Sequence, residues 1–352
     1  MREPAKVLYP RRMVSGAFFA ALLLAGCGRE PAPFYELSGA TMGTRFNVKV
    51  AQPVDEAERS ELQQEIDRAL DRIENAMSTY ILRSDISKFN TSPSTDWIEV
   101  SAITCNAVEA ALGISRLTAG AFDVTVGPLV NLWGFGPDSV RMEPPSQVEI
   151  ETARERVGYE RLHADCEQPA LRKERPDLYV DLSAYAKGLA VDKVASLLDS
   201  YGIRRYLVEI GGELRMRGAA PGRDLWAVAI ETPADTGRAV GRLLRLTDKA
   251  MATSGDYRNF FQFAGKRYSH TIDPRSGLPT AHELASVSVV SDTAAMADAL
   301  ATALLILGPK EGYDLALRQQ IPAYFQLRTS GGFEERMTPA FNALDAAGTA
   351  AE

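Results

Sequence analysis

One acid inside an otherwise apolar helix constrains this chain more than any other feature. Residues 296–308 read MADALATALLILG, which is apolar on nearly every side when wound into an α-helix. A helix of this kind is normally buried. The carboxylate of Asp298 must therefore be paired, hydrogen-bonded or bound to a cation, because an unpaired buried charge is too costly.

The position of Thr302 indicates one possible partner for this acid. Thr302 follows Asp298 by four residues, so a helix places both side-chain oxygens on the same face. A carboxylate and a hydroxyl side by side suit a hard cation such as Mg²⁺. The alternative is a buried acid that caps a neighbouring loop or pairs with an arginine, and this helix alone leaves both interpretations open.

The N-terminus has the pattern of a bacterial lipoprotein signal. A basic start precedes residues 13–26, which are apolar or small and too few to span a bilayer comfortably. Small residues directly before Cys27 resemble a lipobox, in which the cysteine receives lipid and becomes the mature N-terminus. An ordinary signal peptide with a chance cysteine is the alternative.

This pattern leads to a prediction of domains and location. We expect a signal peptide over residues 1–26, a tether over 27–36, one folded domain over 37–335 and a flexible tail over 336–352. Acyl chains on Cys27 would hold the domain at the periplasmic face of a bacterial membrane, more naturally the inner membrane.

Charge and cysteine usage narrow the class of protein. The formal net charge is -7, and removal of the signal, which carries +3, changes it to -10. An acidic domain of this kind has no electrostatic reason to bind nucleic acid. Cys105 and Cys166 can pair in an oxidising compartment, although their separation in sequence does not decide this. No Cys/His cluster has the spacing of a zinc site.

Hydrophobic periodicity predicts an α+β fold with mixed sheets and packed helices. Strands and helices follow one another without strict alternation, and no strong linker divides the mature chain. The expected helices are 56–78, 101–119, 147–157, 184–201 and 296–308, and the expected strands include 44–50, 178–182, 205–210, 226–231, 251–254 and 286–291.

Three further segments carry chemically useful residues. In residues 181–188, Asp181 ends an expected strand and Lys187 lies near a helix N-terminus, which suits phosphate. In residues 269–277, His270 adjoins a polar turn and can exchange a proton near neutral pH. In residues 120–136, the aromatic side chains of Phe122, Trp133 and Phe135 near Asp123 can form a wall for a planar ring. Each also has an ordinary reading: a helix start with a solvated lysine, a surface histidine, and plain core.

These segments, in this order, resemble the ApbE family of FAD:protein FMN transferases. The resemblance implies a fold related to the T-fold. It also implies a reaction in which the FMN half of FAD moves to a Ser or Thr hydroxyl of a partner protein and AMP leaves, with Mg²⁺ assisting. Family partners include subunits of sodium-pumping quinone reductase and of Rnf electron-transport complexes. The matching segments are 39–44, 77–80, 120–125, 181–192, 208–212, 254–257, 270–277 and 297–302, with Gly308.

The resemblance also assigns roles to residues of this chain. Asp298 and Thr302, with the main-chain oxygen of Ala184, become metal ligands, and His270 and Asp298 become catalytic. Tyr185 departs from the family pattern, in which we expect a smaller or aliphatic residue. An FAD pyrophosphatase and a non-catalytic FAD-binding lipoprotein are the alternative functions. The residues expected to hold FAD are Met42, Tyr80, Ala121, Phe122, Asp123, Asp181, Lys187 and Ile272.

Overall fold

The structure is a computed structural model that describes residues 34–350 except 138–140, 234–238 and 258. The predicted signal peptide, Cys27 and most of the predicted tether lie outside the described residues. Within the described part of the chain, no helix is both long enough and apolar enough to cross a membrane.

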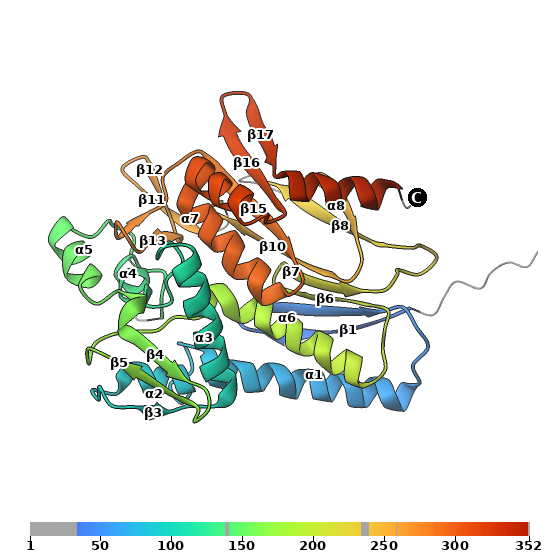
Figure 1. Ribbon diagram of the computed structural model, residues 1–352, viewed down its shortest axis with the longest axis horizontal. Coiled ribbons are helices and arrows are strands. Elements are labelled where there is room, and N and C mark those ends of the chain that lie inside the picture. The colour runs from blue at the N-terminus through green and yellow to red at the C-terminus, as the bar shows by residue number, and fades with distance from the viewer. Residues whose placement is uncertain (1–33, 138–140, 234–238, 258, 351–352) are drawn as a thin grey trace, which may run out of the picture. The chain divides into compact units, whose positions relative to one another are not determined.

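An eight-stranded sheet forms the centre of the domain (Figure 1). Every neighbouring pair of its strands is antiparallel. The expected α+β class is confirmed, and the expected mixed sheets are antiparallel in the described residues. In spatial order the strands are β1 Tyr35–Thr41, β2 Thr44–Val50, β6 Tyr206–Ile210, β7 Glu213–Arg217, β10 Lys249–Gly255, β15 Leu284–Ser291, β16 Ala323–Thr329 and β17 Gly332–Met337.

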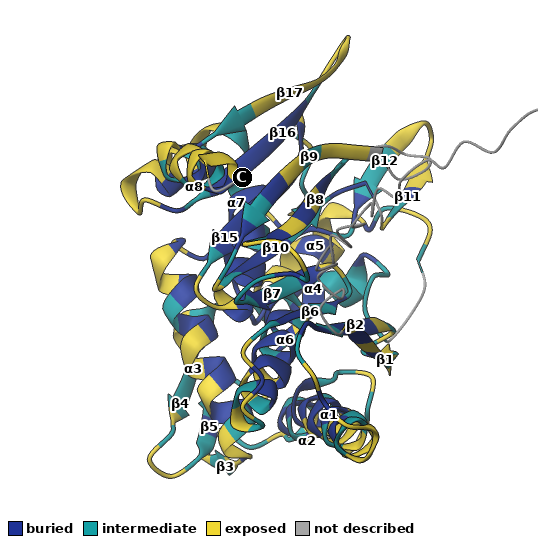
Figure 2. Ribbon diagram, turned by 90° about the vertical axis from the view of Figure 1, so that its right-hand side faces the viewer, coloured by how far each residue is buried: buried dark blue, intermediate teal, exposed yellow. Residues whose placement is uncertain are grey.

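Long helices pack on one face of this sheet, namely α1 Glu56–Met77, α6 Ser183–Ser200 and α7 Ala294–Arg318, and α3 Ala102–Leu117 packs against these helices. The buried side of α1 repeats at helical spacing through Leu62, Ile66, Leu70 and Ile73, which is the periodicity that the sequence predicts. Figure 2 shows this arrangement as buried residues along the strands and exposed residues on the outer sides of α1 and α3.

The other face of the sheet is covered by the hairpin of β8 Trp226–Thr232 and β9 Ala239–Leu246 and by α8 Pro339–Ala350. Helix α8 occupies most of the segment over 336–352 for which we predicted a flexible tail. Phe341 is fully buried and stacks on Tyr324 with ring centroids 5.5 Å apart. Alanine favours helix, and the stacking of Phe341 together with the ion pair between Arg242 and Asp345 holds α8 against β16 and β9.

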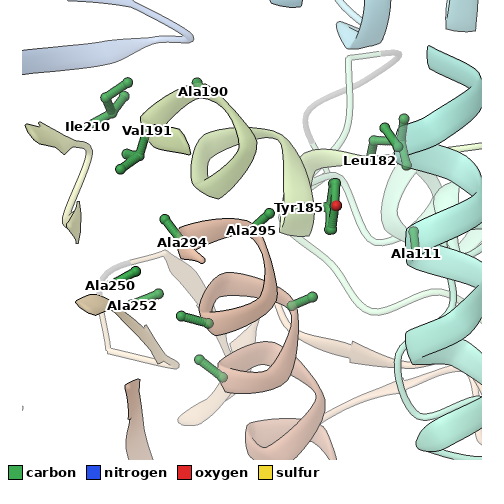
Figure 3. Packing of buried hydrophobic residues seen from close by; sticks show 14 of the residues in the cluster. Ala111, Leu182, Tyr185, Ala190, Val191, Ile210, Ala250, Ala252, Ala294 and Ala295 are labelled. Carbon is green, nitrogen blue, oxygen red and sulfur yellow. The ribbon is translucent and has the colours of Figure 1, made fainter. Parts of the chain in front are cut away.

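Helices α6 and α7 approach each other closely because small residues line their contact. A Cβ atom on Gly188 would collide with the main chain of Ala294 and Ala295, and Figure 3 shows these alanines beside α6. Asp192 of α6 accepts hydrogen bonds from the main-chain nitrogens of Ala294 at 3.0 Å and Ala295 at 2.9 Å. One carboxylate therefore caps the start of α7 and fixes it against α6.

The predicted strand over 178–182 is buried but does not join a sheet. Leu178, Val180 and Leu182 are all buried. The side chain of Asn90 takes the place of a neighbouring strand, because it donates to the Val180 oxygen at 2.8 Å and accepts from the Val180 nitrogen at 2.7 Å. Apolar periodicity indicates that a segment is buried, but it does not show which groups form hydrogen bonds with its backbone.

Cys105 and Cys166 form a disulfide whose Cα atoms are 5.7 Å apart. The bond joins α3 to the turn between β4 Leu162–Asp165 and β5 Ala170–Lys173. The remaining elements are α2 Asp85–Thr91, β3 Ile98–Glu99, α4 Gly127–Leu132, α5 Gln147–Arg154, η1 Tyr159–Arg161, β11 Phe260–Phe263, β12 Lys266–Ser269, β13 Ile272–Asp273 and β14 Leu278–Pro279.

Candidate active site

A cavity of about 1270 Å³ opens where the β1–β2 turn, the starts of α6 and β7, and the middle of α7 meet. Pockets for small molecules usually measure about 300–1,000 Å³, so this one has room for a large ligand. All the residues that the sequence assigns to the site line it: Met42, Tyr80, Ala121, Phe122, Asp123, Asp181, Ala184, Lys187, His270, Ile272, Asp298 and Thr302.

Asp298 lies inside the protein with 3% of its surface exposed. Its Oδ2 accepts a hydrogen bond from the Gly188 nitrogen at 3.1 Å and lies 3.7 Å from the Nζ of Lys187. Burial raises the pKa of Asp298, and the Lys187 ammonium opposes that rise. The carboxylate of Asp298 is therefore paired with a lysine and a backbone amide, and not with the arginine that the sequence left as an alternative.

Thr302 lies one helical turn beyond Asp298, and its Oγ1 is 3.0 Å from the Oγ of Ser254 on β10. Together with Ala184, these residues offer a carboxylate, a hydroxyl and a main-chain oxygen to one cavity. Such oxygen donors suit Mg²⁺. The described residues contain no cluster of three or more His, Cys, Asp or Glu side chains that could hold a metal.

Glu213 is a site residue that the sequence analysis missed. It begins β7 directly after the Gly211 and Gly212 turn, and only 4% of its surface is exposed. Its Oε1 lies 3.3 Å from the Nζ of Lys187, while its buried Oε2 has no hydrogen-bond partner among the described residues. The sequence shows only an acid directly after a tight glycine turn. It does not show on which face of the sheet the side chain of Glu213 lies.

Lys187, Glu213 and Asp298 form a charge cluster that we call the acid–lysine cluster. Burial alone would lower the pKa of Lys187, but the carboxylates of Asp298 and Glu213 outweigh burial and raise it. Burial raises the pKa of Glu213, Lys187 lowers it, and Asp298 raises it further. Burial disfavours the ionised form of both carboxylates, so an added cation would favour that form and stabilise the cluster.

Two acids that the resemblance assigns to FAD binding also shape the loops of the cavity. Asp123 accepts hydrogen bonds from the nitrogen and Oγ1 of Thr125, both at 2.7 Å, and from the nitrogen of Tyr159 at 3.0 Å. Asp181 accepts from the Ser183 nitrogen at 2.8 Å at the start of α6. These bonds rigidify the segments that carry Ala121, Phe122 and Ala184.

Met42 precedes α1 in the sequence and Tyr80 follows it, and both residues line the cavity. The main-chain nitrogen of Met42 donates to Glu74 Oε1 at 2.5 Å, which ties the β1–β2 turn to α1. Tyr80 lines the cavity with 66% of its surface exposed. Its ring is therefore free to contact a planar ligand group.

The predicted aromatic wall is only partly correct. Phe122 and Phe135 line the cavity, but Trp133 does not. Trp133 is buried in a separate apolar cluster, where it stacks on Tyr268 with centroids 5.5 Å apart and donates to the Gly277 oxygen at 2.9 Å. For Trp133, the alternative reading of plain core holds.

His270 presents one ring nitrogen suited to accept a proton. Its Nδ1 lies 3.0 Å from the main-chain oxygen of Asn259. A carbonyl oxygen only accepts, so Nδ1 carries the hydrogen and Nε2 is left with its lone pair. Burial lowers the pKa of His270, and the hydrogen bond to Asn259 partly opposes this. The imidazole is therefore neutral at pH 7.

Comparison with known proteins places this geometry in a family. Residues 42–325 match the sequence profile of the ApbE family. The chain belongs to the ApbE family. Its relatives include an FAD:protein FMN transferase of Vibrio cholerae, 44% identical over 92% of this chain and 96% of the relative. Another, from Haemophilus influenzae, is 39% identical over 95% and 98%.

Solved ApbE structures share the fold. The flavin transferase ApbE of Vibrio cholerae superposes with a TM-score of 0.83 at 42% identity, covering 89% of this chain and 100% of that one. The apo form of the Pseudomonas stutzeri flavinyl transferase ApbE gives a TM-score of 0.82 at 38% identity, covering 90% and 98%.

Tyr185, the departure from the ApbE pattern, does not reshape the cavity. Its neighbours Ala184 and Ala186 line the cavity, whereas Tyr185 is buried in the main core. Figure 3 shows its ring on the side of α6 that lies toward Leu182. The extra bulk is therefore absorbed by core packing.

Proposed function

We propose that this ApbE-family protein transfers FMN from FAD to a Ser or Thr hydroxyl of an acceptor protein, releases AMP and depends on Mg²⁺. The observation that carries the proposal is the convergence of the acid–lysine cluster, Thr302, Ala184 and His270 on one cavity. The curated relatives, named FAD:protein FMN transferases, support it.

The residues divide into those that hold the substrate and those that move charge. Met42, Tyr80, Ala121, Phe122 and Ile272 provide the apolar and backbone surface for the flavin or adenine ring, and they line the cavity. Asp123 and Asp181 keep the flanking loops in place through the hydrogen bonds described above.

The chemistry is a displacement at phosphorus. The acceptor oxygen forms a bond to the phosphorus of the FMN half, and the bond from that phosphorus to the oxygen leaving with AMP breaks. His270 Nε2 takes the hydroxyl proton, and Lys187 stabilises negative charge on the phosphate oxygens. Mg²⁺ bound by Asp298, Thr302 and the main-chain oxygen of Ala184 would neutralise further charge there.

An assay with purified protein, FAD, Mg²⁺ and an acceptor tests this function. Acceptors to try are subunits of sodium-pumping quinone reductase and Rnf-type complexes, since the family resemblance implies them. Flavin fluorescence that stays on the acceptor in a denaturing gel supports transfer. Free FMN and AMP without labelled acceptor would show a pyrophosphatase, and FAD binding without AMP release would show a binding protein.

For location, we propose that lipid on Cys27 anchors the domain at the periplasmic face of the inner membrane. The disulfide between Cys105 and Cys166 supports an oxidising compartment. Metabolic labelling with a fatty acid should mark the wild-type chain but not Cys27→Ser. Equal labelling of both would overturn the anchor.

A further inference from the structure

We propose that Glu213 is a positioning residue: it holds the Lys187 ammonium in the site so that Asp298 remains available to a divalent cation. The inference rests on the proposed function, because it concerns the same phosphate-binding centre. Neither the sequence pattern nor the family resemblance stated above gives Glu213 a role.

The geometry separates the two carboxylates around one lysine. Lys187 Nζ lies 3.3 Å from Glu213 Oε1 and 3.7 Å from Asp298 Oδ2, so the nearer partner is Glu213. The acids come from different elements, because Glu213 begins β7 of the sheet and Asp298 lies on α7. Lys187 is thus held from two directions.

Burial strengthens the charge interactions among Lys187, Glu213 and Asp298. Glu213 and Asp298 expose 4% and 3% of their surfaces, so water does little to screen their charges. The Oε2 of Glu213 is buried without a hydrogen-bond partner in the described part of the chain. A buried carboxylate that keeps an unsatisfied oxygen is unfavourable by itself, and its charge interaction with Lys187 offsets part of that cost.

A cation at Asp298 creates a conflict that Glu213 resolves. Without Glu213, the ammonium of Lys187 has only Asp298 as its anionic partner among these three residues, and it competes with the cation for that carboxylate. With Glu213, the ammonium keeps a partner at 3.3 Å when Asp298 binds a metal. The site could then hold a metal cation and the ammonium at once, and both would neutralise charge on the substrate phosphates.

Glu213 acts through Lys187, so the effect of its substitution on Mg²⁺ affinity must be measured both with and without the lysine. Isothermal titration of Mg²⁺ into the protein without FAD gives the affinity. Loss of a group that supports a metal ligand typically lowers metal affinity about 10–100-fold, and we expect Glu213→Gln to fall in that range. Glu213→Asp should recover part of the affinity.

A double-mutant cycle separates positioning from a general charge effect. In a Lys187→Met background, Glu213→Gln should change Mg²⁺ affinity by less than about threefold, because no ammonium is left to compete. A matched control is Glu36→Gln on strand β1, an exposed acid 3.7 Å from the Nζ of Lys49 that does not line the cavity. This variant should bind Mg²⁺ like the wild type.

Two outcomes would overturn the inference: Mg²⁺ affinity unchanged in Glu213→Gln, or an equal loss in both lysine backgrounds. Thermal unfolding of each variant shows whether it folds, and Glu213→Asp serves if the glutamine variant does not. Absence of FMN transfer by the wild type would defeat the proposed function, whereas wild-type transfer with unaltered Mg²⁺ binding by Glu213→Gln would defeat only this inference.

Discussion

Replacement of Asp298 by Asn is the most informative single change in this protein. The amide oxygen of Asn can still accept the hydrogen bond that the Gly188 nitrogen now donates at 3.1 Å. Burial already raises the pKa of Asp298, so the folded protein gains little from its charge. Because Glu213 still pairs with Lys187 in this variant, we expect the free energy of unfolding to change by about 1 kcal/mol, the net size of one hydrogen bond.

The effect on the cation should be large. Unit charges 4 Å apart at an effective dielectric constant of about 20 attract each other by about 4 kcal/mol. A loss of that size corresponds to a factor of about 10³ in affinity. Asp298→Asn should therefore bind Mg²⁺ about 10³-fold more weakly, as measured by isothermal titration, and should lose Mg²⁺-dependent AMP release.

A control variant is Asp292→Asn, which changes an exposed acid paired with Lys249 at 2.6 Å shortly before α7. Its Mg²⁺ affinity and AMP release should equal those of the wild type. If Asp298→Asn folds and still turns over at the wild-type rate, the metal assignment is refuted, and the carboxylate serves only to pair with Lys187 and Gly188.

The remaining predictions concern His270, α6 and α8. His270→Ala should bind FAD normally in a fluorescence titration while transfer falls about 10²–10⁴-fold; undiminished transfer would make the residue a bystander. Because burial lowers the pKa of His270, wild-type transfer should fall only as pH drops below the ordinary value of 6.5 for histidine, and an acid limb above that value would contradict this. Gly188→Ala should destabilise the protein by about 1–3 kcal/mol in chemical denaturation, because its Cβ meets the main chain of Ala294; wild-type stability would show that α6 and α7 can separate. Phe341→Ala should cost about 3–5 kcal/mol, and a negligible loss would mean that α8 does not contribute to the core.

The sequence predicted most of the elements of the fold because burial leaves a periodic record. The apolar run after Met296 did become a buried helix, interrupted at Gly308, where φ is 79°. The periodicity of α1 likewise placed its buried side correctly. Local patterns could not show what satisfies each buried group. Residues 178–182 were predicted as a strand, although the side chain of Asn90 supplies the backbone hydrogen bonds of Val180.

The sequence and the family resemblance predicted most of the residues that line the cavity, but they did not predict the charge interactions among them. The acid in an apolar helix pointed to Asp298 from the residues alone, and the family resemblance supplied most of the other positions. Glu213 was missed because strand register, which a short segment does not reveal, decides whether an acid faces the core or solvent. Trp133 was wrongly predicted to line the cavity for a related reason. An aromatic residue that is close to a site in the sequence can point away from it and pack in a separate apolar cluster.

The central claim is that oxygens of Asp298, Thr302 and Ala184 hold the cation that neutralises the substrate phosphates. Anomalous diffraction from a crystal soaked with Mn²⁺ and FAD tests it most directly. The account predicts one strong peak in contact with those three oxygens and with a phosphate oxygen of FAD. A fully occupied FAD with no peak there, and with Asp298 bound only to Lys187 and Gly188, would contradict it.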